Sequence, residues 1–218
     1  MRVIYVVILL LLTGCSSTQL VTSWKNPEIV IFDANKVLVV GMTPNESARA
    51  KFETRMQREF AEHQVEAVRS IDVFDVEFTN TAQTETQLDE VESLLLERDY
   101  DAILFTKVLG SETYQSFRQQ MSNLDNYYDD FGDDYLGHQE IYYDADYYDK
   151  YTVYFAETSL YCICIGKERQ LIWRGTLEIS DPIDINKTIN EYIELVVTAM
   201  GAEDIIFREE NLEEDLVY

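Results

Sequence analysis

The chain has 218 residues, of which 46% are hydrophobic, and its 41 acidic against 17 basic side chains give a formal net charge of −24. Such a charge repels phosphate groups and anionic headgroups, which excludes nonspecific binding to nucleic acid or to an anionic lipid surface. A cationic partner, divalent ions or plain solubility all agree with it. The length and composition predict one domain with a single substantial core.

Residues 1–15 have the pattern of an export signal. Arg2 is a short positive region, Val3–Leu12 are a largely apolar run of ten residues, and the sequence Leu-Thr-Gly-Cys ends at Cys15. Ten residues cannot span a bilayer, so we expect residues 1–14 to be cleaved as a signal peptide. The Leu-Thr-Gly-Cys end resembles the lipobox of bacterial lipoproteins, which implies that Cys15 is acylated, with palmitate among its chains, and becomes the new N-terminus. An ordinary secretory leader that contains a cysteine is the alternative.

Residues 15–35 are predicted to be a lipidated tether and the segment that leads onto the fold. Ser16 and Ser17 lack the aspartate that, in many Gram-negative lipoproteins, signals retention at the inner membrane. The resemblance therefore implies the periplasmic face of the outer membrane, with the inner membrane as the alternative. From Cys15 to Trp24 the tether spans roughly 30 Å at full stretch, which keeps the domain close to the membrane. Trp24 fits either packing on the domain or a place at the membrane interface.

Residues 36–63 are the part around which the rest of the chain is organised. The unbroken apolar run Val37–Val40 predicts a central strand that is covered on both faces. Thr43 as N-cap, Pro44 as first helical residue and Glu46 in a capping box predict an immediate turn into a helix. The apolar stripe of that helix recurs every four residues, at Ala48, Phe52, Met56 and Phe60.

A second helix and a further strand complete the predicted parallel part of the sheet. Residues 65–68 and 71–78 are short β-prone segments, and residues 101–109 form another strongly apolar strand. The helix between them ends near Asp99 and has its apolar face at Leu88, Val91, Leu94 and Leu95. Alternating strands and helices are typical of right-handed crossovers that build a parallel βαβαβ unit.

Residues 111–150 differ abruptly in composition. They hold eight of the fifteen tyrosines and ten acidic against two basic residues, with almost no aliphatic side chains. We expect a mobile insert without a core of its own. Residues 129–140 have the length of an EF-hand loop, but Phe131 and Asp134 stand where an oxygen ligand and a glycine are needed. Loose binding of divalent ions and a solvated acidic loop are the remaining hypotheses for Asp129, Asp130, Asp133 and Asp134.

The remaining residues predict an antiparallel hairpin and a final helix. Residues 153–165 and 171–179 are β-rich and are joined by a short polar segment. An apolar stripe over residues 185–200 marks the helix. Residues 209–218 are predicted to be an acidic tail.

The predicted fold class is α/β. One domain over residues 36–208 has a mixed β-sheet, with a parallel βαβαβ part and an antiparallel hairpin, flanked by about three helices. Cys162 and Cys164 lie two apart on a predicted strand, which puts their Cα atoms near the strained limit for a disulfide, so we expect two reduced, buried thiols. They lack the further ligands of a metal site.

Several short motifs together resemble a known family. They are the run Thr22–Pro27, the strands 36–41 and 101–104, the Tyr-rich insert, and the segments 159–161, 171–173 and 180–182. In this combination the chain resembles an uncharacterised family of small bacterial envelope lipoproteins, which implies a lipid anchor and an α/β domain but no catalytic residue. The order of elements is also similar to the amino-terminal domain of the periplasmic protein TolB, at the level of fold alone. In the lipoprotein family a glycine usually ends the first helix, where this chain has His63 and Gln64.

The sequence contains no enzyme motif. Gly-x-Ser-x-Gly, His-Glu-x-x-His and a phosphate-binding glycine loop are absent, and the histidines are His63 and His138 alone. The sequence predicts a lipid-anchored, non-enzymatic interaction or assembly module of the envelope, with no cofactor and with a protein partner that it does not identify. One alternative is a metal-dependent hydrolase or calcium-binding module that uses the insert. Another is a subunit of an oligomeric pore, which would need a second amphipathic hairpin.

Overall fold

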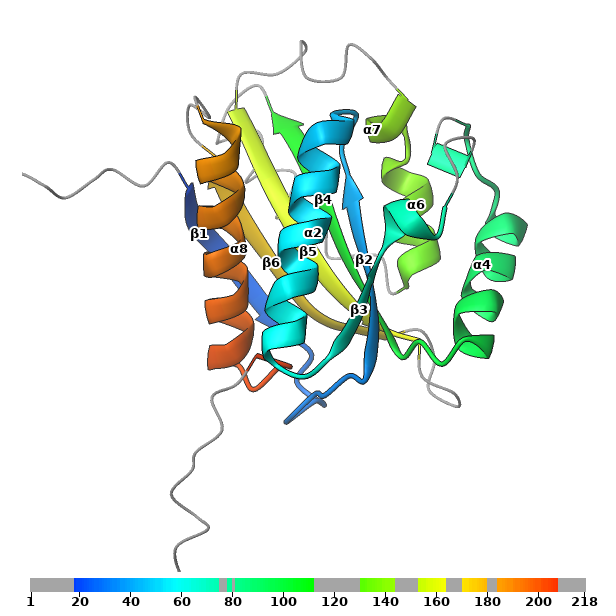
Figure 1. The fold of residues 1–218 in the computed structure, drawn as a ribbon, viewed down its shortest axis with the longest axis horizontal. Coiled ribbons are helices and arrows are strands. Elements are labelled where there is room, and N and C mark those ends of the chain that lie inside the picture. The colour runs from blue at the N-terminus through cyan, green and yellow to red at the C-terminus, as the bar shows by residue number, and fades with distance from the viewer. Residues whose placement is uncertain are drawn as a thin grey trace, which may run out of the picture.

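A computed structural model of the chain describes residues 18–74, 78–79, 81–111, 130–143, 153–163, 170–179 and 184–207. Six strands form one mixed sheet in the order β1-β6-β5-β4-β2-β3 (Figure 1). The strands are β1 (Thr18–Lys25), β2 (Lys36–Met42), β3 (Glu66–Arg69), β4 (Ala102–Ser111), β5 (Val153–Cys162) and β6 (Gln170–Ile179). The helices are α2 (Glu46–Glu62), the 3₁₀ turn η1 (Ser70–Asp72), α4 (Glu85–Glu97), α6 (Phe131–His138), α7 (Glu140–Tyr143) and α8 (Ile185–Ala202). None of these helices is both long enough and apolar enough to cross a membrane.

The parallel half of the sheet is the predicted βαβαβ unit. β2 pairs in parallel with β3 on one side and with β4 on the other. The chain passes from β2 through α2 to β3, and then through α4 across β2 to β4. Of the two β-prone segments after α2, the first forms β3, whereas the second begins as η1 and is not a strand where it is described. The other half of the sheet contains the predicted hairpin, in which β5 and β6 pair antiparallel. β5 also pairs antiparallel with β4 and so joins the hairpin to the parallel half. The predicted α/β class is therefore confirmed.

The start of α2 lies two residues later than predicted. Asn45 rather than Thr43 is the N-cap, and its side-chain oxygen accepts the N–H of Ala48 at 3.0 Å. The Thr43 hydroxyl instead accepts the N–H of Asn45 at 3.3 Å, so Thr43 and Pro44 belong to the turn before the helix. Glu46 lies in the first turn, where its charge is stabilised by the helix dipole. It does not form a capping box because, with Asn45 as the N-cap, Glu46 is the first helical residue and the third is Ala48, which has no side-chain acceptor.

Three helices end without a glycine. The residue after each C-cap is left-handed, with φ 61° at Gln64 after α2, 63° at Asp99 after α4 and 59° at Asp204 after α8. A left-handed residue lets the chain leave the helix while its N–H still bonds a carbonyl of the last turn. Glycine adopts this conformation without strain and other residues at a cost of about 1–2 kcal/mol. Gln64 therefore adopts the left-handed conformation, at that cost, where the lipoprotein family that the sequence resembles usually has a glycine.

The two faces of the sheet bury two separate cores. Alternate residues of β2 divide between them, with Val37 and Val39 in one and Leu38 and Val40 in the other. α2 and α8 lie side by side over the first face (Figure 1) and contribute Phe52, Met56, Phe60, Tyr192, Ile193, Val196 and Met200. α4, α6 and α7 cover the second face with Leu88, Leu95, Phe131, Tyr135, Ile141 and Tyr142. The predicted apolar stripe of α2 is buried at Phe52, Met56 and Phe60, as expected.

One close contact in the first core restricts the sequence. The Trp173 side chain is completely buried on β6. Its ring lies across Gly175, where an added Cβ would stand 2.2 Å from a ring atom. Because the ring has no room to move, a residue with a side chain does not fit at Gly175.

Part of the segment expected to be a tether is a strand. β1 pairs antiparallel with β6 along its length and forms one edge of the sheet. The tether from Cys15 to the first residue of the fold, Thr18, therefore has three residue steps and reaches roughly 10 Å. The sequence had predicted a tether of nine steps that reaches to Trp24. Trp24 lies on β1 and keeps 45% of its surface exposed. The polar residues between the apolar ones of β1 hide the strand in the sequence, since an exposed edge strand needs no apolar face.

The insert contributes to a core where the structure describes it. α6 and α7 bury Phe131, Tyr135, Ile141 and Tyr142 on the second face of the sheet. Residues 130–143 therefore form no core of their own but pack into the core of the second face, which the sequence did not predict. The reason is that aromatic rings, such as Phe131 and Tyr135 one helical turn apart, supply the apolar surface that aliphatic side chains usually provide. The rest of the insert lies outside the described residues.

Candidate functional site

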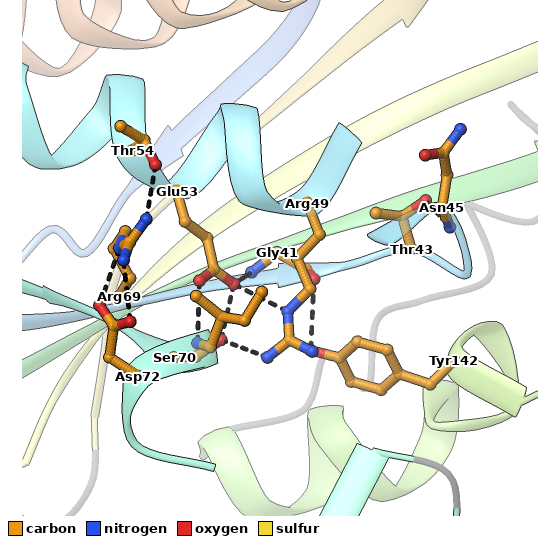
Figure 2. Close-up of polar contacts among 11 residues, drawn as sticks. Gly41, Thr43, Asn45, Arg49, Glu53, Thr54, Arg69, Ser70, Asp72 and Tyr142 are labelled. Atoms are coloured by element: carbon orange, nitrogen blue, oxygen red, sulfur yellow. Dashed lines mark hydrogen bonds and ion pairs between the residues drawn. The ribbon is translucent and has the colours of Figure 1, made fainter. Parts of the chain in front are cut away.

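The carboxyl end of β2 is where an α/β sheet of this topology places a ligand. The helix that follows β2 and the helix that precedes β4 lie on opposite faces of the sheet, and in open α/β sheets such an arrangement leaves a crevice beyond the strand ends. Figure 2 shows the residues gathered there: Gly41 at the end of β2, Arg49 and Glu53 on α2, Ser70 on η1 and Tyr142 on α7. Their contacts decide whether this crevice is open to a ligand.

Glu53 is the centre of these contacts and is completely buried. Its Oε1 accepts the N–H of Gly41 at 3.0 Å, Nε of Arg49 at 3.0 Å and the Ser70 hydroxyl at 2.6 Å. Its Oε2 accepts the N–H of Ile71 at 3.0 Å. The guanidinium of Arg49 also donates to the Ser70 hydroxyl, at 2.8 Å. These bonds hold β2, α2 and η1 together, and both carboxylate oxygens are engaged in holding them.

Tyr142 closes the crevice from the other side. Its hydroxyl donates to the carbonyl of Gly41 at 3.3 Å, and the Arg49 guanidinium carbon lies 5.2 Å from the centre of its ring. Burial raises the pKa of Tyr142, which keeps the phenol protonated as a donor. In Figure 2, Thr43 and Asn45 lie apart from this cluster, at the start of the helix. The crevice is thus filled by the chain's own Tyr142, and its polar groups act as structural contacts.

A second polar cluster lies under α6 on the other half of the sheet. Nζ of Lys107, on β4, lies 2.5 Å from Oδ1 of Asp134 on α6 and 2.8 Å from Oε1 of Glu157 on β5. The Tyr161 hydroxyl donates to Oδ2 of Asp134 at 2.6 Å, and Nδ1 of His138 lies 3.0 Å from Oδ1. Lys107, Asp134 and Glu157 are all buried. This cluster ties α6, which belongs to the insert, to the centre of the sheet.

The charges in this cluster stabilise one another. Burial acts to lower the pKa of Lys107, but Asp134 and Glu157 outweigh it and the pKa lies above its ordinary value. Burial likewise acts to raise the pKa of Asp134, but Lys107 and His138 hold it well below the ordinary value. Burial and the neighbouring Asp134 carboxylate both raise the pKa of Tyr161, which therefore stays a neutral donor. Because the pKa of Lys107 is raised and that of Asp134 is lowered, the two side chains form an ionised pair.

Of the four carboxylates considered for divalent ions, the three that the structure describes have separate environments. Asp134 is buried beside Lys107, whereas Asp130 is the N-cap of α6 and accepts the N–H of Asp133 at 2.9 Å. Asp133 is exposed in the first turn, and Asp129 lies outside the described residues. Among the residues that the structure describes, no group of three or more His, Cys, Asp and Glu side chains is placed to hold a metal ion.

The cysteines and histidines were the other residues singled out in the sequence. Cys162 is disulfide-bonded, so the prediction of a reduced thiol is wrong there. The expected Cα separation assumed a strand that runs past both cysteines, whereas β5 ends at Cys162. Cys164, like Cys15, lies outside the described residues. His63 is the C-cap of α2, with Nδ1 2.9 Å from the carbonyl of Glu59.

A groove between α2 and α8 is the part of the surface that sequence reasoning did not predict. It has a volume of about 500 Å³ and is lined by Ser47, Ala50, Lys51, Thr54, Arg55 and Arg58 of α2 and by Asn186, Ile189 and Asn190 of α8. Arg55 forms an ion pair with Glu59. Lys51 and Arg58 are exposed, and neither forms an ion pair within the described part of the chain. The groove residues of α2 recur at helical spacing, so their shared face of the helix could have been predicted from the sequence. The groove residues of α8 could not have been predicted in this way.

Comparison with known proteins gives structural likenesses only. No family model matches the chain, and no curated protein matches it. Among solved structures, the PelC dodecamer from Paraburkholderia phytofirmans has a TM-score of 0.41 at 8% identity, over 83% of this chain and 95% of that chain. The lipoprotein GNA1162 from Neisseria meningitidis has a TM-score of 0.37 at 12% identity, over 76% of this chain and 96% of that chain. The resemblance to a lipoprotein family stays a prediction from the sequence.

Proposed function

We propose that this chain is a lipid-anchored, non-enzymatic protein of the bacterial envelope, held at the periplasmic face of the outer membrane as an interaction or assembly module. The observation that carries the proposal is the Leu-Thr-Gly-Cys end of the leader at Cys15. The start of β1 at Thr18 supports it, because a link of roughly 10 Å would hold the domain directly against the lipid surface.

The two polar clusters support a role other than catalysis. A general acid or base needs a proton-exchanging group within reach of a substrate. Glu53 and Asp134 are each fully buried, and their oxygens are engaged by groups of the chain itself. Tyr142 occupies the crevice in which a substrate of an α/β enzyme would lie. The partner is proposed to be another envelope protein.

Substitution of Cys15 tests the anchor. We expect Cys15→Ser to abolish incorporation of labelled palmitate and to leave either an unprocessed precursor or a released soluble form, because the leader is too short to stay in a bilayer. The measurement is palmitate labelling with separation of soluble, inner-membrane and outer-membrane fractions. Maturation of the Cys15→Ser protein and its recovery with the outer membrane would show that the lipoprotein proposal is wrong.

Two substitutions beside Cys15 serve as matched controls in the same assay. Ser17→Ala retains Cys15 and should be labelled and fractionated like the wild type. Ser16→Asp should still be labelled but should move to the inner-membrane fraction, since an aspartate directly after the lipidated cysteine is the retention signal that the resemblance implies. A Ser16→Asp protein that stays in the outer membrane would contradict the proposed sorting.

A further inference from the structure

The groove between α2 and α8 carries a concentrated positive charge on a strongly negative chain. Lys51, Arg55 and Arg58 project from one stripe of α2, at spacings of four and three residues. At a rise of about 1.5 Å per residue the three cations span roughly 10 Å of the helix. Arg55 has one acidic neighbour, Glu59, whereas Lys51 and Arg58 have no ion-pair partner among the described residues. The groove is therefore suited to a ligand with several negative charges in a row.

The net charge of −24 restricts what that ligand can be. The field of the whole chain repels a long polyanion or an anionic membrane before it reaches the groove. A short acidic segment that is already attached to the domain does not face this barrier, because tethering replaces a bimolecular encounter by a local concentration that reaches the millimolar range. The residues beyond α8 contain such a segment.

We propose that the groove binds the chain's own acidic segment, residues 209–215. Its sequence Glu-Glu-Asn-Leu-Glu-Glu-Asp has five carboxylates in seven residues. In an extended chain Glu213 and Asp215 lie on one side, ~6.6 Å apart. Lys51 and Arg55 are roughly 6 Å apart along α2, so the two spacings match.

The end of the described chain lies close to the groove. Phe207 packs on Phe60 of α2, with ring centres 4.8 Å apart, and on His63, with ring centres 5.2 Å apart. Phe60 lies two residues, roughly 3 Å along the axis, beyond Arg58. The chain thus leaves the domain beside the end of α2 at which the stripe of cations begins.

The segment is long enough to follow the groove. Eight residue steps separate Phe207 from Asp215, which reach roughly 27 Å when extended. About 10 Å of this length covers the distance from Arg58 to Lys51, which leaves about 17 Å to pass around a helix whose diameter with side chains is about 10–12 Å. The segment can therefore place its carboxylates beside all three cations within a single chain.

Zero-length carbodiimide crosslinking tests the proposal on the full chain, because Lys51 has a reactive amine. We expect amide bonds between Lys51 and carboxylates of residues 209–215, identified by mass spectrometry of the digested monomer. Lys187 on α8 is the matched control: its side chain is 57% exposed, but it does not line the groove. The linkage should disappear in about 1 M salt, where the screening length falls to about 3 Å.

A charge-removing variant sharpens the experiment. Arg55→Gln with Arg58→Gln keeps Lys51 and should lower the Lys51 linkage roughly tenfold, since each exposed ion pair lost weakens the contact about threefold. Arg58 is exposed and the Arg55–Glu59 pair contributes only about 0.3–0.5 kcal/mol, so the melting temperature should fall by no more than about 2 °C, which separates loss of binding from loss of folding. Mixing ¹⁴N-labelled and ¹⁵N-labelled chains shows whether a link joins one chain or two. Links only between chains, equal linkage of Lys51 and Lys187, or no link at Lys51 would each overturn the proposal.

Discussion

The two faces of the sheet are closed by different physical means. The face under α2 and α8 is apolar along most of its length and buries hydroxyls, with Oγ1 of Thr106 2.7 Å from Oγ1 of Thr158, and its buried charges, Arg49 and Glu53, lie at one end beside Gly41. The face under α4, α6 and α7 buries charges, because Lys107 and Asp134 meet at its centre. α8 is held by its apolar stripe, and α2 by its stripe together with Glu53 at the end of β2, whereas α6 is held by an ion pair at the centre of its face.

This difference concerns specificity more than stability. An apolar contact tolerates small shifts between a helix and a sheet, but a buried charge must find its counter-charge or lose several kcal/mol of desolvation energy. α6 has only eight residues and belongs to an insert with few aliphatic side chains. We infer that Asp134 sets the position of α6 on the sheet.

The largest expected effect is that of removing Lys107. Lys107→Met leaves the Asp134 and Glu157 carboxylates buried without their shared cation, which should lower the free energy of unfolding by about 3–5 kcal/mol. Lys187→Met is the control, because the exposed pair of Lys187 with Glu191, at 3.4 Å, contributes less than about 1 kcal/mol. Urea denaturation measures both. A loss below about 1 kcal/mol for Lys107→Met would show that this face does not depend on the ion pair.

The elements that sequence reasoning predicted correctly are those with long apolar runs or stripes. Val37–Val40 and the apolar strand at 101–109 form β2 and β4, and the stripe of α2 is buried. β1 was missed because an edge strand needs no apolar face. α6 was missed because its core contacts come from aromatic rings in an acidic segment, and ring packing does not show in a count of aliphatic residues.

A smaller effect is expected from acid. The folded-state pKa of Asp134 lies below its ordinary value of about 3.9, so its contribution is complete above about pH 5 and is lost as the pH falls through the folded value. The destabilisation by Asp134→Asn should accordingly be largest near neutral pH and should shrink as the pH is lowered from 5 to 3. Urea denaturation of both proteins across this range gives the difference. A difference that grows towards pH 3 would mean that Asp134 is protonated in the folded protein.

The smallest effect is expected from Tyr142→Phe. This change removes one hydrogen bond, from the Tyr142 hydroxyl to the carbonyl of Gly41, and keeps the ring over Arg49. The loss should be about 1 kcal/mol in urea denaturation. Tyr143→Phe alters a neighbouring side chain that is 44% exposed and should stay within about 0.5 kcal/mol of the wild type. Equal effects of the two substitutions would mean that the Tyr142 hydroxyl does not hold α7 in place.

The polar clusters show where sequence reasoning stops. Arg49 and Glu53 are one helical turn apart, so their pairing could have been read from spacing. Ser70 joins them only because β3 runs parallel to β2 and ends beside it, and Asp134 meets Lys107 although 27 positions separate them in the sequence. A sequence gives the chemistry of such side chains, but the pairs are set by the topology of the sheet. For this reason Asp134 was grouped with its acidic neighbours in the sequence, whereas its side-chain contacts are with a lysine, a tyrosine and a histidine.

The position of β1 at the sheet edge has a mechanical consequence. If the chain is anchored through Cys15 as proposed, any force between membrane and domain enters the fold at Thr18, the first residue of β1. A pull along the strand loads the hydrogen bonds between β1 and β6 together, in shear, whereas a pull across the strand opens them one after another. The fold therefore resists such a force best when its strands are perpendicular to the membrane. If the domain tilts, the same hydrogen bonds are loaded one at a time, beginning at the anchored end of β1.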